Sequence, residues 1–259
     1  MARKREFGEG PIFTITNYIF WFMAGSFYFA ICNILLIFTF LALATTDPQQ
    51  VTSGGADFSF LTMILISAIP TGPAITALLS AMGKLVREKD VNITKDYFRA
   101  YKENFKQSLF VWVLELAAIG ILIIDVYFFS RQSYGTFVVP FIFAIGIVIL
   151  TMGLFAFPII SRFHMKTKDI IRLSFYYVIV KFKITFLNIA AIIIAVFAVS
   201  KFPITIIFIA CVVCYLLMYY QKDLFKELEN QIKDTNGSDE NKEDSSGKVF
   251  SDKLKDSLK

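Results

Sequence analysis

Glu115 is the residue whose position most directly suggests chemistry, because it lies inside a long apolar segment. An ionisable side chain at membrane depth is costly, so it generally has a partner or a function. Two interpretations stay open: a proton-coupled step on a solute path, or a structural hydrogen bond between helices. Amide side chains in other apolar segments are candidate donors for such a bond. They are Asn17, Asn33 and Asn188.

A second unusual feature is the sequence Pro70-Thr71-Gly72-Pro73 within another apolar segment. Two prolines remove backbone donors and interrupt a helix, and lipid offers no group to replace them. The pattern therefore predicts a discontinuous helix. The break could line a solute or ion path, as in transporters, or it could be a packed kink among small residues. The candidate binding residues are Pro70, Gly72, Pro73 and Glu115.

Patterns typical of enzymes and metal sites are weak in this chain. Cys211 and Cys214 have the spacing of redox and zinc motifs, but they lie within an apolar segment without a second ligand pair. They are predicted to be buried core cysteines, and the one histidine, His164, cannot form a metal cluster. We find no nucleophile elbow, zinc-protease helix or phosphate-binding loop. The sequence therefore predicts a protein that is not an enzyme and holds no catalytic residue, metal or cofactor.

Helices in a membrane must position these residues. Hydrophobic residues make up 56% of the chain and the mean hydropathy is +0.61, which would coat a soluble domain in apolar side chains. A spanning helix needs about 20 apolar residues. The predicted fold is an all-α polytopic membrane bundle over residues 1–220 with about six transmembrane helices. The predicted spans are 17–44, 58–82, 108–129, 136–160, 184–200 and 203–220.

The distribution of lysine and arginine predicts the orientation of the bundle. Cytoplasmic connections retain these residues, which are frequent in 84–107 and 161–183 but absent between Thr45 and Asp57. Both termini are therefore expected in the cytoplasm. The basic residues do not form a nucleic-acid motif, so the expected partner is the lipid bilayer and not nucleic acid. Pro203 separates the last two segments, and their combined length favours a hairpin over one kinked helix.

Both basic connections are predicted to form amphipathic elbow helices on the cytoplasmic membrane surface. In the first connection, Thr94 is the expected N-cap, and four aromatic residues fall on one side at helical spacing. These aromatic residues could contact a protein partner, or they could only hold the bundle at the lipid surface. They are Tyr97, Phe98, Tyr101 and Phe105.

Residues 221–259 form an acidic and amphipathic tail that is predicted to be cytoplasmic and largely disordered. Its first part continues as a short amphipathic helix with Leu224, Leu228 and Ile232 on one stripe. The segment Asp234–Gly247 is polar and is expected to be disordered. Apolar residues recur among lysines near the end of the tail. That pattern suits docking on lipid or on a partner, but also a tail that only frays.

Two stretches carry a resemblance to a known family. The first, residues 69–78, reads IPTGPAITAL, and the second, residues 96–108, reads DYFRAYKENFKQS. Together they resemble the YesL family of bacterial integral membrane proteins, an uncharacterised-domain family, and the likeness extends more loosely over residues 10–220. The resemblance implies a multi-pass protein of a Gram-positive plasma membrane. Relatives are commonly encoded beside oligosaccharide ABC transporters, which implies a link with carbohydrate utilisation, but no site residues are established for the family.

The expected function is that of a non-enzymatic accessory or regulatory protein in carbohydrate uptake or sensing. Its expected partners are an ABC transporter permease or a sensor kinase subunit, contacted through the basic elbows and the tail. The alternative is a small secondary transporter or channel, in which the broken second span and Glu115 line the path.

Overall fold

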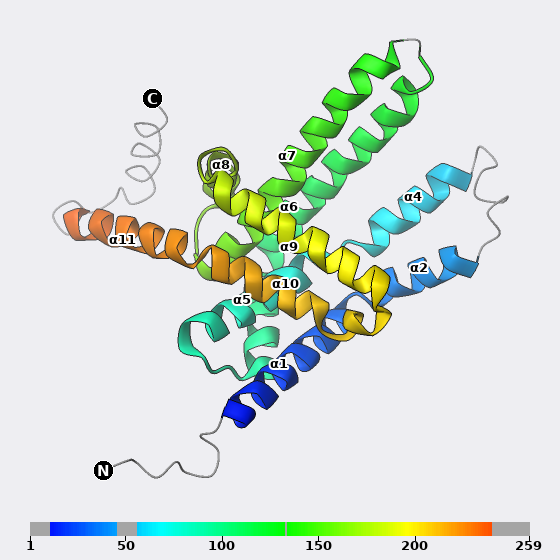
Figure 1. Ribbon diagram of the computed structural model, residues 1–259. Helices are drawn as coiled ribbons and strands as arrows, with labels where there is room; N and C mark the ends of the chain where they lie inside the picture. Colours follow the sequence, from blue (N-terminus) through cyan, green and yellow to red (C-terminus); the bar gives the residue numbers. More distant parts are fainter. Residues whose placement is uncertain (1–10, 46–55, 133, 240–259) are drawn as a thin grey trace, which may run out of the picture.

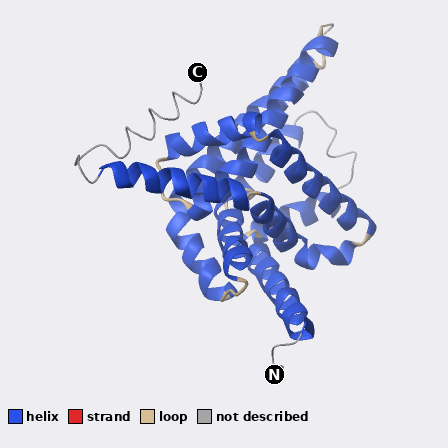
Figure 2. Ribbon diagram, turned by 60° about the vertical axis from the view of Figure 1, so that its left-hand side comes forward, coloured by secondary structure: helices blue, strands red, loops and turns tan. Residues whose placement is uncertain are grey.

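The computed structural model describes residues 11–45, 56–132 and 134–239, and these ranges are helical and contain no strand (Figure 1). The predicted all-α class is therefore confirmed, and Figure 2 shows the same helices from a second direction. The elements are α1 (Pro11–Cys32), α2 (Ile34–Thr45), α4 (Ala56–Ser67), α5 (Thr71–Glu88), α6 (Ile93–Phe129), α7 (Gly135–Arg162), α8 (Thr167–Val180), α9 (Phe182–Lys201), the short 3₁₀ helix η1 (Pro203–Thr205), α10 (Ile206–Tyr220) and α11 (Lys222–Asp239).

Several of these helices suit a lipid bilayer. Within the described ranges, five are long and apolar enough to cross it: Ile12–Cys32, Ser59–Glu88, Ile93–Phe129, Gly135–Arg162 and Phe182–Lys201. A sixth crossing results if Ile207–Tyr220 and Lys222–Ile232, which meet at 52°, form one bent span. The chain is thus a helical membrane protein, and its described part has five or six helices that suit a crossing, where the apolar segments predict about six.

The central helix of the bundle is α5, which packs against α1, α6, α7 and α10. Many of its side chains are small, and small residues let neighbouring helices approach closely where no hydrophobic effect drives their association. The fully buried residues of α5 include Ala74, Ala77, Leu78, Ala81 and Met82. This helix therefore forms the core on which the other spans assemble.

Three helical pairs extend from this centre. The ends of the α6–α7 and α2–α4 pairs point to the right in Figure 1, away from the start of α1 and from α11. Phe137 and Phe141 of α7 are 77% and 73% exposed, as suits helices that face lipid. In the third pair, α9 and α10 pack against each other across η1. The last two predicted segments therefore form a hairpin rather than one kinked helix.

The first basic connection is not a separate elbow helix, contrary to our prediction. It forms the beginning of α6, a continuous helix of 37 residues, because no glycine or proline interrupts it before Gly120. The N-cap is Asn92, whose side chain accepts a hydrogen bond from Lys95 N at 3.3 Å. Thr94 is not the cap, and its hydroxyl instead shares a 2.8 Å hydrogen bond with that of Tyr28. The second basic connection does form a separate helix, α8.

A buried glutamine joins α7 to the bend between α10 and α11. Pro158 lies inside α7 and has no N–H to donate to Leu154 O, four residues earlier. Gln221 Nε2 donates to this carbonyl instead, at 2.9 Å. Gln221 is fully buried. Its amide therefore satisfies the carbonyl that Pro158 leaves free in α7 and ties the bend between α10 and α11 to that helix.

The first part of the tail is an ordered helix packed on the bundle. Leu224, Phe225 and Leu228 of α11 are at most 3% exposed. Two ion pairs add to this contact: Arg162–Glu229 at 2.8 Å and Lys181–Glu227 at 2.9 Å. The helix continues to Asp239, so it enters the segment predicted to be disordered from Asp234. The remainder of that segment and the end of the tail fall in residues 240–259, which lie outside the described part of the chain.

Candidate functional site

The second span is interrupted where the sequence predicts a break. Pro70 is the residue before α5, and Pro73 lies in the first turn of that helix. N–H groups in a first turn have no acceptor within their own helix, so a proline is tolerated at that position. At the break, Ala68 O accepts a hydrogen bond from Trp112 Nε1 of α6 at 2.7 Å. A neighbouring helix therefore satisfies a backbone group beside the interruption.

Gly72 lets α6 approach this break closely. A Cβ atom at Gly72 would lie 2.3 Å from Trp112 Cβ and 2.5 Å from Trp112 Cγ. Such distances are far inside van der Waals contact, so a side chain at this position requires the helices to move apart. Pro70, Gly72 and Pro73 are not among the described residues that line the cavity discussed below. Their geometry therefore favours a packed kink over a path-lining element.

Thr71 links the break in the second span to an interruption in the first. Its hydroxyl donates to Asn33 Oδ1 at 2.6 Å, and Asn33 Nδ2 donates to Phe29 O at 2.8 Å. Asn33 separates α1 from α2 and is only 3% exposed. Asn33 therefore makes a hydrogen bond between helices, but as the acceptor and not as the predicted donor. The two interruptions support each other.

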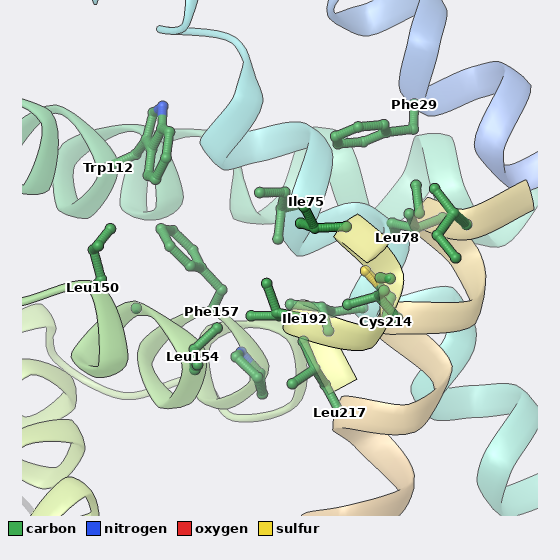
Figure 3. Close-up of a pocket in the computed structure, with 18 of the residues that line it drawn as sticks. Phe29, Ile75, Leu78, Trp112, Leu150, Leu154, Phe157, Ile192, Cys214 and Leu217 are labelled. Carbon is green, nitrogen blue, oxygen red and sulfur yellow. The ribbon is translucent and has the colours of Figure 1, made fainter. Parts of the chain in front are cut away.

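An apolar cavity of about 560 Å³ lies between α1, α5, α6, α7, α9 and α10. Figure 3 shows Trp112 and Ile75 on one side of it, with Phe157 and Leu217 on the other. The rings of Trp112 and Phe157 meet edge to face at 5.7 Å. The volume falls in the range of roughly 300–1,000 Å³ that is usual for small-molecule sites. The site is therefore large enough for a ligand.

Glu115 carries the one charged side chain among the described residues that line this cavity. It is 9% exposed, and within the described ranges we find no hydrogen bond or ion pair to its carboxylate. The carboxylate lies against Gly153 of α7, where an added Cβ atom would be 2.6 Å from Oε1 and 2.9 Å from Oε2. Gly153 thus provides the space that Glu115 occupies, and a polar group faces an otherwise apolar wall.

The four aromatic residues of the first basic connection do not share one surface. Tyr97 is fully buried, with its ring 5.9 Å from that of Tyr28 in α1. Tyr101 is half-buried and stacks on Tyr97 at 6.4 Å. Phe98 and Phe105 are 45% and 37% exposed. Tyr97 is therefore a core residue rather than part of a partner surface. The aromatic residues that a partner could still contact are Phe98 and Phe105, with the half-buried Tyr101 between them in the sequence.

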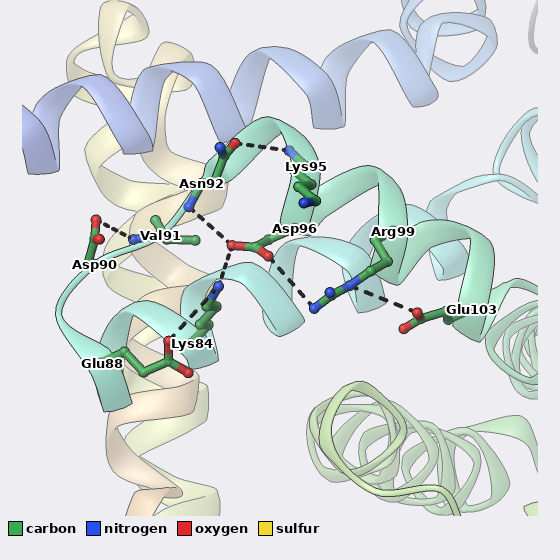
Figure 4. A network of polar contacts seen from close by, with 9 residues as sticks. All are labelled: Lys84, Glu88, Asp90, Val91, Asn92, Lys95, Asp96, Arg99 and Glu103. Atoms are coloured by element: carbon green, nitrogen blue, oxygen red, sulfur yellow. Dashed lines mark hydrogen bonds and ion pairs between the residues drawn. The ribbon is translucent and has the colours of Figure 1, made fainter.

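A polar cluster fastens the start of α6 to the end of α5 (Figure 4). Asp96 Oδ2 accepts from Lys84 Nζ at 2.9 Å and from Asn92 N at 3.1 Å. The Asp96 side chain is 9% exposed, and that of Lys84 is 30% exposed. Arg99 lies 3.8 Å from the other Asp96 oxygen. Asp96 is therefore a structural carboxylate that closes the turn between the two helices.

Replacing Lys84 with methionine is expected to lower the free energy of unfolding by about 1–2 kcal/mol, because Asp96 would lose its nearest cation while staying buried. The midpoint of thermal unfolding of the purified protein in detergent should fall by roughly 2–6 °C. Lys95→Met is the control, since Lys95 is exposed and makes no ion pair among the described residues. Equal midpoints for the two variants would show that the Lys84–Asp96 pair contributes nothing.

Other polar groups of the interior do not line the cavity, except for the thiol of Cys214. Both side-chain polar atoms of Asn188 and the Oε1 atom of Gln221 are buried without a partner in the described ranges. Cys211 and Cys214 are buried free thiols of α10. No group of three or more His, Cys, Asp or Glu side chains able to hold a metal occurs in those ranges. The sequence gives no sign of Gln221 as a contact, because its partner is a backbone carbonyl in a distant helix.

Comparison with known protein families finds a match in the first half of the chain. The family described as "Protein of unknown function, DUF624" matches residues 13–126. Residues 13–126, which make up less than half of the chain, are similar to this family. This uncharacterised family includes the YesL-like membrane proteins, so the resemblance is confirmed. No curated protein and no solved structure matches the chain.

The DUF624 match contains the break in the second span, the start of α6 and Glu115. It ends within α6, whereas the opposite wall of the cavity is built by α7, α9 and α10. The cavity is therefore formed jointly by the DUF624 segment and by the helices that follow it.

Proposed function

We propose that the chain is a non-enzymatic accessory or regulatory protein of a Gram-positive plasma membrane, associated with oligosaccharide ABC uptake or its sensing system. Its proposed partners are an ABC transporter permease or a sensor kinase subunit. The observation that carries the proposal is an exposed face on the first turns of α6, formed by Phe98, Lys102 and Phe105. We refer to these three residues as the elbow face.

The length of α6 supports contact with a partner outside the hydrocarbon of the membrane. A helix of 37 residues is about 55 Å long, and the hydrocarbon core is about 30 Å thick. Tilt shortens the remaining excess but does not remove it. The charged cluster around Asp96 lies in the first turn of α6, so this end stands in water or among headgroups. Exposed phenylalanines there are typical of a protein contact.

The spacing of the elbow face supports a helix-in-groove contact. Its members stand at positions i, i+4 and i+7 of one helix, the pattern by which helices present anchors to a groove. Lys102 adds a positive charge between the two rings, which suits an acidic residue on a partner. The expected orientation, with both termini in the cytoplasm, puts this face on the side where transporter ATPases and kinase domains lie.

The link with carbohydrate uptake is supported by the YesL resemblance. The apolar cavity is a poor match for an oligosaccharide, whose hydroxyl groups would lack hydrogen-bond partners there. Under this proposal the sugar is handled by the partner protein, and the chain described here assembles, stabilises or regulates that partner.

The proposal is tested by crosslinking in native membranes, followed by affinity capture and identification of the captured proteins. Cells grown on a complex carbohydrate should yield a sugar permease or a sensor kinase with the tagged chain. Phe98→Ala/Phe105→Ala should lose the partner, whereas Phe137→Ala, a change at an exposed site on α7, should keep it. Recovery of the wild-type chain alone under both carbohydrate and glucose growth would contradict the proposal.

A second candidate function is that of a small secondary transporter or channel. It is favoured by the unpaired Glu115 carboxylate on the cavity wall, although Pro70, Gly72 and Pro73 do not reach that wall. This candidate predicts solute flux into liposomes that contain the purified protein, abolished by Glu115→Gln. Absence of flux over a panel of ions, sugars and apolar solutes would reject it.

A further inference from the structure

The cavity beside Glu115 has the features of a ligand site and not only of a packing space. We propose that it binds a lipophilic organic cation, with the positive centre at Glu115 and the apolar body between α7, α9 and α10. The proposal goes beyond the accessory function and does not depend on it. It rests on the cavity, the unpaired carboxylate and the two aromatic rings that line the same cavity.

Glu115 supplies the first part of the argument. It is about nine-tenths buried and lacks a protein partner among the described residues. An uncompensated carboxylate in apolar surroundings is unfavourable. A bound cation restores the missing interaction, and the low polarity of the cavity strengthens the attraction between the two charges. An anionic ligand, or a neutral one without a hydrogen-bond donor, would leave the carboxylate unpaired.

The aromatic residues supply the second part. Trp112 lies one helical turn before Glu115 on α6, and both line the cavity. Its indole N–H is engaged by Ala68 O at 2.7 Å, which fixes the ring, and Phe157 packs against it at 5.7 Å. A cation near a fixed indole face gains a cation–π attraction. A cavity lined by a carboxylate and by aromatic rings therefore favours organic cations over neutral apolar molecules.

The remaining wall sets the character of the ligand body. It consists mainly of aliphatic side chains that cannot hydrogen-bond, as Figure 3 shows for Leu150, Leu154 and Ile192, together with Phe29 and the thiol of Cys214. A small hydrated cation would find no oxygen ligands besides those of Glu115. A sugar would leave its hydroxyl groups without partners. The ligand class that fits is a cation with a bulky aliphatic or aromatic body.

The test measures binding of radiolabelled tetraphenylphosphonium to the full chain in nanodiscs of zwitterionic lipid, with empty nanodiscs as the blank. Saturable binding is expected for the wild type. Glu115→Gln should weaken it at least about tenfold, because one partner of a desolvated charge pair is removed. Asp125→Asn should leave affinity unchanged, since Asp125 is on the same helix but not in the lining. Tetraphenylborate, an anion of similar shape, should not compete beyond its uptake by lipid.

A second variant separates loss of binding from loss of folding. Ala195→Phe adds a ring to the cavity from α9 and should abolish binding while the charge at Glu115 remains. Circular dichroism and gel filtration check that each variant is folded. The proposal is overturned by absence of saturable binding to the folded wild type, or by equal affinity for wild type and Glu115→Gln. Because the readout is equilibrium binding, neither result bears on partner capture by the elbow face.

Discussion

Replacing Gly72 with alanine is expected to lower the free energy of unfolding by about 2–3 kcal/mol, the usual cost of forcing an atom into a packed interior. The added Cβ atom would lie 2.3 Å from Trp112 Cβ, and a Cβ atom cannot turn away as the end of a flexible side chain can. Either α5 and α6 separate, or Trp112 loses its hydrogen bond to Ala68 O. The measurement is the thermal unfolding midpoint of the purified protein in detergent.

The matched control for this change is Gly146→Ala in α7. A Cβ atom at Gly146 would meet Leu122 Cδ1 at an ordinary 3.6 Å. Alanine also favours helix over glycine by about 1 kcal/mol, so this variant should be neutral or more stable. If both variants unfold at the same temperature, the close contact between Gly72 and Trp112 does not determine the packing of the break.

Replacing Phe225 with alanine is expected to release α11 from the bundle. The Phe225 ring is fully buried, packs against Phe163 at 5.8 Å and lies beneath the Arg162 guanidinium at 5.3 Å. Truncation of a buried phenylalanine costs about 3–5 kcal/mol, which exceeds the contribution of exposed ion pairs such as Lys181–Glu227. Trypsin should therefore cut after Lys222 and Lys226 at least about tenfold faster than in the wild type.

The control for the α11 experiment is Asn230→Ala, a change at an exposed position of the same helix. It should leave the rate of proteolysis unchanged. If the wild-type chain is already cut at these lysines as fast as an unfolded peptide, α11 is not docked. A slow rate in Phe225→Ala would instead show that the ion pairs alone are sufficient to hold it.

The apolar helices are predictable from the sequence because each is an apolar run, and this property is local, although predicted span 17–44 is divided between α1 and α2 at Asn33. The break at Pro70 is predictable for the same reason, since a proline acts on its own helix. The residue at which α6 starts is less predictable from the sequence. Asn92 and Thr94 are both good capping residues, and Tyr28 of α1 is the group that engages the Thr94 hydroxyl. A contact between distant segments therefore decides which of the two caps the helix.

In the candidate site, too, features set by one helix are predictable from the sequence, and features set by contacts between distant helices are not. Glu115 is recognisable from sequence as a buried carboxylate, because an acidic residue stands out in an apolar run. Its position on a cavity wall depends on α7, α9 and α10, and the need for a glycine at 153 depends on how close α6 and α7 approach. Helical spacing groups Tyr97 with Phe105, but it does not say which side of α6 packs against α5. Tyr97 is consequently buried, although its neighbour Phe98 is exposed.

The elbow face is tested most directly by site-specific photocrosslinking in living cells. A photoreactive phenylalanine analogue is placed at position 98, at position 105 or, as a control, at position 137. We expect adducts with a permease or a sensor kinase from positions 98 and 105, and adducts with lipid alone from position 137. Adducts with lipid alone from all three positions would contradict a partner-binding role for this face.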